Sequence, residues 1–525
     1  MQTSADLAFT APPALPFQVI ADRVRDHARE RPDHVALMQG DDVLDYAALD
    51  GLMDRIAASL QRDGLRPDDA IAICASTSVR YAALYLGALR AGIVVAPLAS
   101  SVTTASFASM LDDAQAALLF VDEAAAAVLG GVTRDDVVSI ALDAGGPGRA
   151  FDDWLMPEGA TPRPVDVRPD WPFNIIYSSG TTGQPKGIVQ SHGMRWTHVM
   201  RGNQYGYSPD GVTLLATPLY SNTTLVVFFP TIAFGGTVIL MAKFDAAAYV
   251  ALAQHHAVTH TMLVPVQYRR IMALPDFDAF DLRSFHMKFC TSAPFAAALK
   301  ADVLARWPGG LVEFYGMTEG GGTCMLLAHE NPDKLHTVGR PADGHDIRLI
   351  DDAGVELPPG STGEVVGHSA GMMSGYHRQA AKTREAEWFD PDGKRFIRTG
   401  DVGRFDADGF LVLMDRKKDM IISGGFNIYP SDLEAVLRAH AAVADVAVVG
   451  VPSEAWGETP IAFVVVREGM HDTAAGLMAW ANGRVGKTQR LARLDLIDEL
   501  PRSAIGKILK KDLREAHIAS GEAPR

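Results

Sequence analysis

Cysteine is scarce in this sequence. Its 525 residues contain only three cysteines, Cys74, Cys290 and Cys324, and these lie far apart along the chain. Such spacing supplies neither the framework of a disulfide-stabilised secreted domain nor a CxxC metal site. We therefore expect a reducing, cytoplasmic environment, with Cys290 and Cys324 acting as packing residues rather than nucleophiles.

Long hydrophobic runs are also missing. The richest stretch, around residues 225–240, is broken by Pro230 and a pair of glycines, and no window approaches the about 18 apolar residues that a membrane span needs. The opening segment MQTSADLAFTAPPALPF lacks the basic region and apolar core of a secretory signal. The sequence predicts no membrane span and no export signal.

Positive charge is in deficit. Lys and Arg number 48 against 63 Asp and Glu, which gives a net charge of −15 and argues against a nucleic-acid-binding protein. The deficit is uneven, because from Arg416 to the end 15 basic residues face 14 acidic ones. A change of charge balance at that point indicates a separate domain.

The pattern of apolar segments predicts an α/β protein. Runs such as AIAICA (70–75) and NIIYSS (174–179) alternate with helical stretches, which is typical of a largely parallel sheet covered by helices. We expect a large amino-terminal domain of stacked α/β subdomains over 1–415, with a small β-rich part at about 338–414. A hinge at 416–418 then leads to a small α+β carboxyl-terminal domain over 419–525.

The segment YSSGTTGQPKG, from Tyr177 to Gly187, carries the clearest chemical signal. Its hydroxyl groups, glycines and lysine offer many unhindered donors, as a loop that wraps a polyphosphate requires. It is not a Walker loop, because Pro185 stands before Lys186 where that motif has glycine. The plain alternative is a flexible Gly/Ser/Thr loop. The candidate phosphate ligands are Ser178, Ser179, Gly180, Thr181, Thr182, Gly183 and Lys186.

This segment and others in order along the chain resemble the adenylate-forming superfamily of acyl-CoA synthetases, peptide-synthetase adenylation domains and beetle luciferases. The further matching segments are TSAPF (291–295), EFYGMTE (313–319), VGRP (338–341), TGD (399–401), DRKKDMIISGGFNIYPSDLE (415–434) and PRSAIGKILKKDLR (501–514). Their order and number identify the chain as a member of the acyl-CoA synthetase branch of this superfamily.

The resemblance implies a nucleotide site. Read alone, Glu319 is a surface acid and TGD is a turn. The resemblance instead implies that Thr318 contacts the α-phosphate of ATP and that Glu319 holds Mg²⁺. The residues that the resemblance places around the adenine are Ser292, Ala293, Glu313, Phe314 and Tyr315, and Tyr315 stacks on the base. Those that it places on the ribose are Asp401 and Arg416.

The resemblance also implies a mobile carboxyl-terminal domain. Lys507, which alone reads as a solvated lysine, is then the catalytic lysine that bridges the substrate carboxylate and the α-phosphate, a placement that suits a developing negative charge. Lys418 is the hinge, and Gly424 and Gly425 line a tunnel for pantetheine. The implied reaction forms acyl-AMP and pyrophosphate, after which domain rotation lets a thiol displace AMP.

The segment ATPLYSNTT (216–224) bears on which carboxylic acid is the substrate. It lacks the aspartate that pairs with an α-ammonium group in amino-acid-activating relatives, and Tyr220 is followed by Ser221 and Asn222 where acyl-CoA ligases usually have histidine. Those two side chains either bond a polar substituent of the acid or merely line the pocket and cap a helix. The resemblance adds Gly316, Gly320 and Gly321 to the acyl pocket, where glycines either make room or serve backbone geometry.

We expect an aromatic, aryl-propenoic or medium-chain acid, with CoA as acceptor. Only about 22 residues separate Arg340 from Gly363, too few for the insertion of fatty-acyl-AMP ligases, and no carrier domain is appended. The alternatives are a freestanding adenylating enzyme that loads an acyl carrier protein, and a nucleotide-binding regulator without turnover. ATP and CoA are thus the expected co-substrates; the oligomeric state, a homodimer included, stays open.

Overall fold

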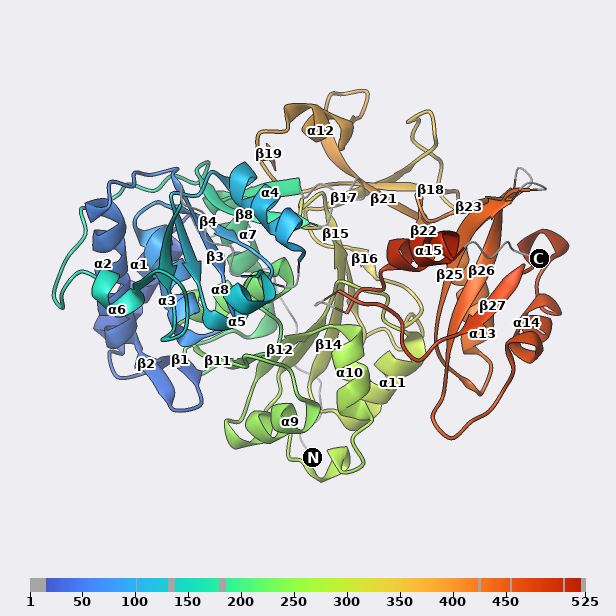
Figure 1. Cartoon of the computed structure of the whole chain (residues 1–525), viewed down its shortest axis with the longest axis horizontal. Coiled ribbons are helices and arrows are strands. Elements are labelled where there is room, and N and C mark those ends of the chain that lie inside the picture. Colours follow the sequence, from blue (N-terminus) through green and yellow to red (C-terminus); the bar gives the residue numbers. More distant parts are fainter. Residues whose placement is uncertain are drawn as a thin grey trace. The chain divides into compact units, whose positions relative to one another are not determined.

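The computed structural model describes residues 16–100, 102–130, 137–178, 186–423, 426–453, 456–503 and 506–520. The chain forms two compact units (Figure 1). Unit 1 comprises Met1–Asp346 and Gly367–Ile397, and unit 2 comprises Ile347–Val366 and Arg398–Arg525. Unit 2 therefore begins earlier in the chain than the boundary at 415 that the sequence predicts, and the hinge at 416–418 stays a prediction.

A nine-stranded sheet forms one layer of unit 1. Its order is β16-β15-β14-β13-β12-β10-β11-β1-β2, and the neighbouring pairs from β14 to β1 are parallel. The near-continuous apolar character of these short strands suits a sheet buried on both faces. The strands are β1 Val35–Gln39, β2 Asp42–Asp45, β10 Val212–Leu215, β11 Thr237–Leu240, β12 His260–Leu263, β13 Met287–Cys290, β14 Gly310–Gly316, β15 Thr323–Leu327 and β16 Arg340–Pro341.

A second sheet of eight strands forms another layer of unit 1. Its order is β19-β9-β8-β4-β3-β5-β6-β7. Strand β9 pairs with β8 and β19 in antiparallel fashion, and the other described pairs are parallel. The strands are β3 Ala70–Cys74, β4 Val94–Pro97, β5 Leu118–Val121, β6 Val138–Ala141, β7 Arg149–Ala150, β8 Pro172–Ser178, β9 Lys186–Ser191 and β19 Gly375–Tyr376. The expected stacked α/β subdomains are thus confirmed.

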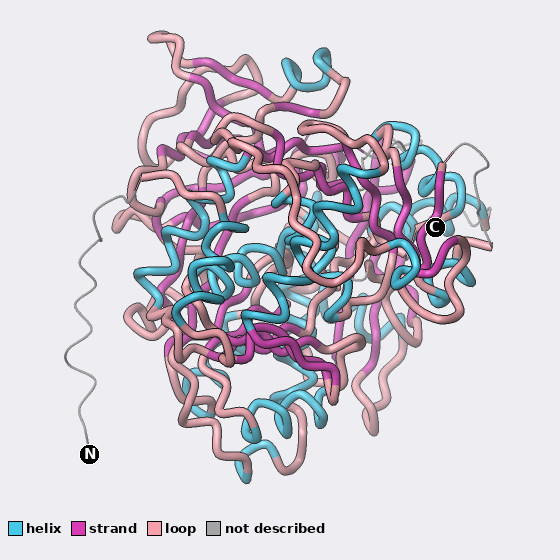
Figure 2. The backbone as a smooth tube through the Cα atoms, turned by 90° about the vertical axis from the view of Figure 1, so that its left-hand side faces the viewer, coloured by secondary structure: helices cyan, strands magenta, loops and turns pink. Residues whose placement is uncertain are grey.

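One hydrophobic core joins these two sheets. Ile71 and Ile73 of β3 belong to the same buried cluster as Leu215 of β10 and Val238 of β11, together with apolar residues of α1, α2, α3 and α8. Every residue of helix α3 except Arg80 is buried, as is typical of a helix packed within a core. Figure 2 shows the helices in cyan among the magenta strands. The helices of unit 1 are α1 Ile20–Glu30, α2 Tyr46–Arg62, α3 Val79–Arg90, α4 Thr104–Ala114, α5 Glu123–Val128, α6 Phe151–Trp154, α7 His192–Arg201, α8 Asn222–Ala233, α9 Ala246–His255, α10 Pro265–Met272, α11 Ala297–Arg306 and α12 Ala380–Glu385.

Short polar residues start many of these helices. A side-chain oxygen just before the helix accepts a hydrogen bond from a first-turn backbone N–H, which satisfies a donor that the helix itself leaves unpaired. Ser191 does so for α7 and Ser221 for α8, the two helices that enter the site described below. The other capping residues of this kind in unit 1 are Asp45, Ser78, Thr103, Asp122 and Asp245.

The segment expected to be β-rich contains a third sheet of order β17-β18-β21-β20, with β22 paired to β21. Its strands are β17 Asp346–Ile350, β18 Thr362–His368, β20 Glu387–Phe389, β21 Arg395–Phe405 and β22 Leu411–Arg416. The unit boundaries at 366/367 and 397/398 fall within β18 and β21.

The carboxyl-terminal part of unit 2 is an α+β fold, as expected. Strand β25 is buried on both faces: Val446 and Val448 belong to one apolar cluster, with residues of α13 and α14, and Ala447 and Val449 belong to another, with Leu513 of α15. This alternation is the period of two that a strand requires. The elements are β23 Ile421–Ser423, β24 Phe426–Ile428, α13 Pro430–Arg438, β25 Val443–Ser453, β26 Gly457–Val466, α14 Ala474–Asn482, β27 Arg493–Leu496 and α15 Lys510–Ala519. None of the helices in the described ranges combines the length and hydrophobicity that a bilayer span requires.

A buried ion pair ties α11 to β14. Lys300 Nζ pairs with the carboxylate of Glu313, and both residues are less than 5% exposed. The ammonium group also donates hydrogen bonds to the carbonyl oxygens of Leu335, at 2.8 Å, and Thr337, at 3.0 Å. Each charge therefore depends on the other, since an unpaired buried charge is costly.

We predict that Lys300→Met lowers the free energy of unfolding by about 3–5 kcal/mol, because it leaves the Glu313 carboxylate buried without a counter-ion. Urea unfolding followed by circular dichroism measures this loss. The control is Lys511→Met, whose ion pair with Glu515 is exposed on α15 and whose loss should cost less than about 0.5 kcal/mol. Equal effects of the two substitutions would contradict the assignment.

Candidate functional site

The candidate phosphate loop joins two paired strands. Ser178, the last residue of β8, pairs with Lys186, the first residue of β9. Ser179, Gly180, Thr181, Thr182 and Gly183 lie outside the described residues, as does the side chain of Ser178. Both strands are held at the mouth of the hairpin, because Tyr177 Oη donates to Asp113 Oδ2 at 2.8 Å and the His377 amide donates to the Gly187 carbonyl at 2.6 Å.

Gly187 has a packing reason in this hairpin. A Cβ atom there would lie 2.7 Å from Ile175 Cγ2 and 2.9 Å from Asp113 Oδ2. Both distances are too short for real contacts, so the close approach of the two strands and Asp113 requires a residue without a side chain. The final glycine of the motif therefore supports the position of Lys186, its neighbour.

Three side chains from distant segments meet beside this hairpin. Lys186 Nζ lies 4.9 Å from the centre of the Tyr376 ring, and Tyr376 Oη donates a hydrogen bond to Glu319 Oε1 at 2.8 Å. Burial and the nearby Glu319 carboxylate raise the pKa of Tyr376, so the phenol keeps the proton that it donates. One tyrosine side chain thus contacts both the Lys186 ammonium, through its ring, and the Glu319 carboxylate, through its hydroxyl, although these two groups belong to separate motifs.

The residues present fit one Mg²⁺ ion shared with phosphate oxygens. Within the described ranges, no group of three or more His, Cys, Asp or Glu residues is arranged to hold a metal, so a cage built from protein ligands alone is absent there. Mg²⁺ needs only one or two carboxylates when phosphates and water complete its shell. Glu319 is 9% exposed and uses Oε1 to accept from Tyr376, which leaves Oε2 as the donor atom for a cation.

The segments TSAPF and EFYGMTE belong to neighbouring strands. TSAPF directly follows β13, and EFYGMTE begins within β14 and continues past its end. Strands β13 and β14 are parallel, with Cys290 beside Glu313, so Ser292 and Tyr315 lie at the same carboxyl-terminal edge of the sheet, where α/β proteins bind ligands. Ser292 has φ of 80°, a left-handed conformation that is costly for a residue other than glycine. Its Oγ lies 2.6 Å from Thr223 Oγ1, which holds the strained residue against the start of α8.

The side chains of Glu313 and Phe314 are engaged elsewhere. Glu313 pairs with Lys300 in the interior, and the Phe314 ring lies 5.7 Å from the Phe289 ring and 5.9 Å from the Tyr205 ring. The backbone at these two positions lies within the sheet, where β14 pairs with β13 and β15 and the Phe314 carbonyl accepts from Thr291 Oγ1 at 2.9 Å. Their assignment to the adenine therefore stays a prediction. Ala293 and Tyr315 are only partly buried and stay candidates for contact with a base.

A buried polar network connects the acyl-site candidates to Thr318. Gln190 Nε2 donates to the Thr318 carbonyl at 2.7 Å, and Arg195 donates to the amide oxygens of both Gln190 and Asn222. Ser221, in contrast, is used locally, because its Oγ accepts from the Thr223 amide and caps α8. Of the two polar residues after Tyr220, Ser221 therefore serves as a helix cap, and Asn222 belongs to the network.

The glycines near Thr318 have packing reasons as well. A Cβ atom on Gly320 would lie 1.9 Å from the Gly371 carbonyl oxygen, and one on Gly321 would lie 2.4 Å from Ile397 Cβ. Gly316 is less restricted, with Thr323 Oγ1 at 3.2 Å. Of the two explanations that the sequence left open, the structure supports backbone geometry at Gly320, which has φ of 72°, and close packing against Ile397 at Gly321.

Unit 2 gathers the remaining candidates. Arg416 Nε lies 3.1 Å from Asp401 Oδ1, and the two residues face each other across paired strands β21 and β22. Burial lowers the pKa of Lys507 to about 8, and the nearby cations Arg416 and Lys418 add to that effect. Lys507 is therefore close to the residues assigned to ribose and hinge. Gly424 and Gly425 lie outside the described residues.

Three residues of the site were not predicted from the sequence. Tyr376, Gln190 and Arg195 belong to no motif, and Tyr376 contacts Glu319 across 57 positions of the chain. A usable signal existed only for Arg195, an arginine next to the apolar residues Met194, Trp196 and Val199 on the buried face of α7. The three cysteines are free and buried, in agreement with a packing role.

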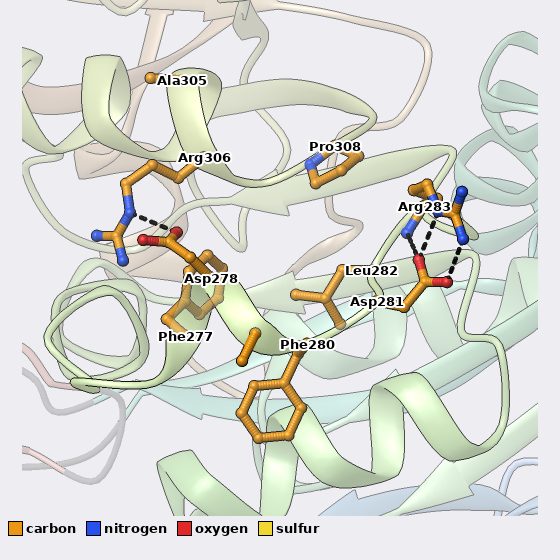
Figure 3. Close-up of a pocket in the computed structure, with 10 residues that line it drawn as sticks. Phe277, Asp278, Phe280, Asp281, Leu282, Arg283, Ala305, Arg306 and Pro308 are labelled. Carbon is orange, nitrogen blue, oxygen red and sulfur yellow. Dashed lines mark hydrogen bonds and ion pairs between the residues drawn. The ribbon is translucent and has the colours of Figure 1, made fainter.

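A pocket elsewhere in unit 1 is poorly suited to binding a charged ligand (Figure 3). It is lined by Phe277–Arg283 with Ala305, Arg306 and Pro308. Its cations are already paired, Arg306 with Asp278 at 2.9 Å and Arg283 with Asp281 at 2.6 Å. It offers no free charge to a ligand.

Family comparison agrees with this geometry. The model of the AMP-binding enzyme family matches residues 24–377, and that of the AMP-binding enzyme C-terminal domain matches residues 432–507. The chain belongs to the AMP-binding enzyme family and is a ligase of the acyl-CoA synthetase type. The adenylate-forming assignment made from the motifs is thereby confirmed.

Its relatives match over nearly their full length. An indoleacetate–CoA ligase of Aromatoleum aromaticum is 33% identical over 94% of this chain and 98% of its own, and a feruloyl-CoA synthase of Amycolatopsis is 33% identical over 93% and 96%. A fatty acid–[acyl-carrier-protein] ligase, ScoC of Streptomyces coeruleorubidus, is 31% identical over 95% and 96%. The solved structure of ATP-bound MatB from Rhodopseudomonas palustris superposes with a TM-score of 0.84 at 28% identity, covering 97% of this chain and 100% of that one.

We predict that Tyr376→Phe weakens binding of Mg²⁺-ATP about tenfold, because Glu319 loses a charge-assisted hydrogen bond that orients it for the cation. Calorimetric titration with and without Mg²⁺ measures this change. Without Mg²⁺ the variant and the wild type should bind ATP alike, and an equal loss in both conditions would contradict a role through the metal. Tyr249→Phe, which removes a buried bond to Thr261, serves as the matched control.

Proposed function

We propose that this chain is an AMP-forming carboxylate–CoA ligase for an aromatic, aryl-propenoic or medium-chain acid. The observation that carries the proposal is the meeting of Lys186 and Glu319 on Tyr376 beside the phosphate loop. A cation and a carboxylate at that place suit the phosphates of ATP and their metal ion. The family membership of the chain and the names of its relatives support the same reaction class.

The proposed first step is adenylation. A carboxylate oxygen of the acid attacks the α-phosphorus of ATP in line, and the bond to the β-phosphate breaks to release pyrophosphate. Lys186 and the loop donors bind the phosphates, Thr318 orients the α-phosphate, and Glu319 holds Mg²⁺, which neutralises phosphate charge when bound. Lys507 supplies a cation where the negative charges of the two reactants come together.

The proposed second step is thioester formation. The thiol sulfur of CoA attacks the acyl carbonyl carbon, and the bond to the AMP oxygen breaks. We assign Asp401 and Arg416 to the ribose, Lys418 to the hinge of the domain rotation, and Gly424 and Gly425 to the pantetheine path. These assignments rest on the motif positions. Arg416 and Lys418 are near enough to Lys507 to lower the pKa of its ammonium group.

The acid class is argued from charge and from relatives. Among the described residues at the start of α8, no carboxylate is available to pair with an α-ammonium group, and the network there is built from amides and Arg195. Two relatives named above act on aryl-bearing acids, an indoleacetate and a ferulate. Both points favour an aryl acid over an amino acid.

A carrier-protein acceptor is the second candidate, because one relative that matches over nearly the full chain is an acyl-carrier-protein ligase. The two candidates share adenylation and differ only in the thiol. We therefore predict pyrophosphate release with Mg²⁺-ATP and aryl acids, followed by conversion of the acyl-AMP to a thioester when CoA is added. Mass spectrometry of the products measures both steps. Acyl-AMP that persists with CoA but is consumed by a phosphopantetheinyl carrier protein would overturn CoA as acceptor.

We predict that Lys507→Ala slows pyrophosphate release about 10²–10³-fold, while synthetic acyl-AMP is still converted to thioester. Because the pKa of Lys507 is about 8, its positive charge is present below that pH and is lost above it, so the adenylation rate of the wild type should fall as pH rises past 8. Lys507→Arg keeps its charge and should lack this fall. A rate unchanged in Lys507→Ala would show that the lysine has no catalytic role.

A further inference from the structure

Arg195 is a buried cation without an anionic partner. It is 1% exposed, and within the described part of the chain no carboxylate pairs with it and its Nε and one terminal nitrogen have no hydrogen-bond partner. Its guanidinium carbon lies 5.8 Å from the centres of the Phe173 and Phe229 rings. Burial of a charge with so few partners is costly, so its retention calls for a functional reason.

The bonds that Arg195 does make determine how two amides point. One terminal nitrogen donates to Gln190 Oε1 and, at 2.7 Å, to Asn222 Oδ1. A guanidinium group can only donate, so both amides must turn their oxygen atoms towards it. Gln190 then directs its nitrogen at the Thr318 carbonyl, at 2.7 Å. Asn222 must direct its Nδ2 group away from Arg195.

The Nδ2 group of Asn222 lies at the start of α8 and has no acceptor in the part of the chain that the structure describes. Asn222 is partly exposed. The next residue, Thr223, contacts Ser292 of the TSAPF segment at 2.6 Å, and Gln190 lies between Asn222 and Thr318. This donor therefore lies next to two segments that the proposed function places around the acyl-adenylate.

We propose that Asn222 is a specificity-determining residue that donates a hydrogen bond from Nδ2 to an oxygen acceptor on the acid, separate from the carboxylate that is activated. Arg195 is the positioning residue that presents this donor. The proposal rests on the proposed function and deepens it: the preferred acid is an oxygenated one, bearing a hydroxyl, ether or carbonyl oxygen. An apolar acid leaves the amide donor unpaired when it displaces water, which lowers its kcat/KM.

The test compares acids that differ by one oxygen. Pyrophosphate release is measured with 3-phenylpropenoic acid and its 2-, 3- and 4-hydroxy and methoxy derivatives. The wild type should prefer at least one oxygenated acid over the parent, and Asn222→Leu should reduce that kcat/KM ratio about three- to tenfold. The loss should come from the oxygenated acid, with the parent acid unchanged or improved.

Two further variants separate positioning from structure. Asn222→Asp keeps an oxygen for Arg195 and removes the donor, so it should lose the preference for the methoxy acids, whose oxygen can only accept, without loss of thermal stability. Arg195→Met should lose the preference as well, because the Asn222 amide is then free to rotate. The control is Arg90→Met, which removes a buried arginine paired with Asp50 and Asp54 and should lower stability while keeping the preference.

Several outcomes would overturn the proposal. A wild type with no preference for any oxygenated acid would do so, as would an Asn222→Leu variant that loses equally on the parent and oxygenated acids, since the amide would then serve the reacting carboxylate. Preference retained in both Asn222 variants would also reject it. A wild type that releases no pyrophosphate with any acid, while still binding Mg²⁺-ATP, would refute the proposed function, and the inference would fall with it.

Discussion

The hydrophobic core shared by the two sheets of unit 1 is the constraint on which the rest of the site depends. It packs β3 and β10 against the same set of helices, α3 and α8 among them, and interiors of this kind tolerate little displacement. Because α8 is held in that core, its amino-terminal end is fixed beside β9 and the segment after β13. Motifs far apart in the sequence therefore meet at the edges of rigid elements.

Three buried cations show how this core uses polar groups. Lys300 is neutralised by Glu313, and Lys288 donates to the carbonyl oxygens of Trp307, Pro308 and Gly309. Arg195, in contrast, donates hydrogen bonds only to amide oxygens among the described residues, and its guanidinium group lies over the Phe173 and Phe229 rings. The first two are satisfied within the fold and connect elements of its core. Two of the three nitrogens of Arg195 have no hydrogen-bond partner among the described residues. Its main effect is to orient the amides that lie between the acyl-site candidates and Thr318, because hydrogen bonds in a low-dielectric interior are strong and directional.

Sequence patterns predicted the elements well wherever local chemistry decides the outcome. The apolar run at 70–75 contains β3, and the segment at 177–187 joins β8 to β9, because strand burial and the conformational freedom of glycine are local properties. Prediction was weaker where one residue had two explanations. Ser221 proved to be a helix cap, and Gly320 and Gly321 proved to be required by the close approach of Gly371 and Ile397. Gly371 and Ile397 lie far along the chain from the glycines that they constrain, so no local pattern reveals the contact.

The sequence by itself determined the family, the α/β class and the order of the motifs, because these depend on residue types at short spacings along the chain. The tertiary structure alone decided that Tyr376 links Lys186 to Glu319, that Glu313 turns inward to Lys300, and that Arg195 orients Asn222. Each of these contacts joins segments that only packing brings together. Their energies depend on burial and on the geometry of donor and acceptor, neither of which exists until the chain is folded.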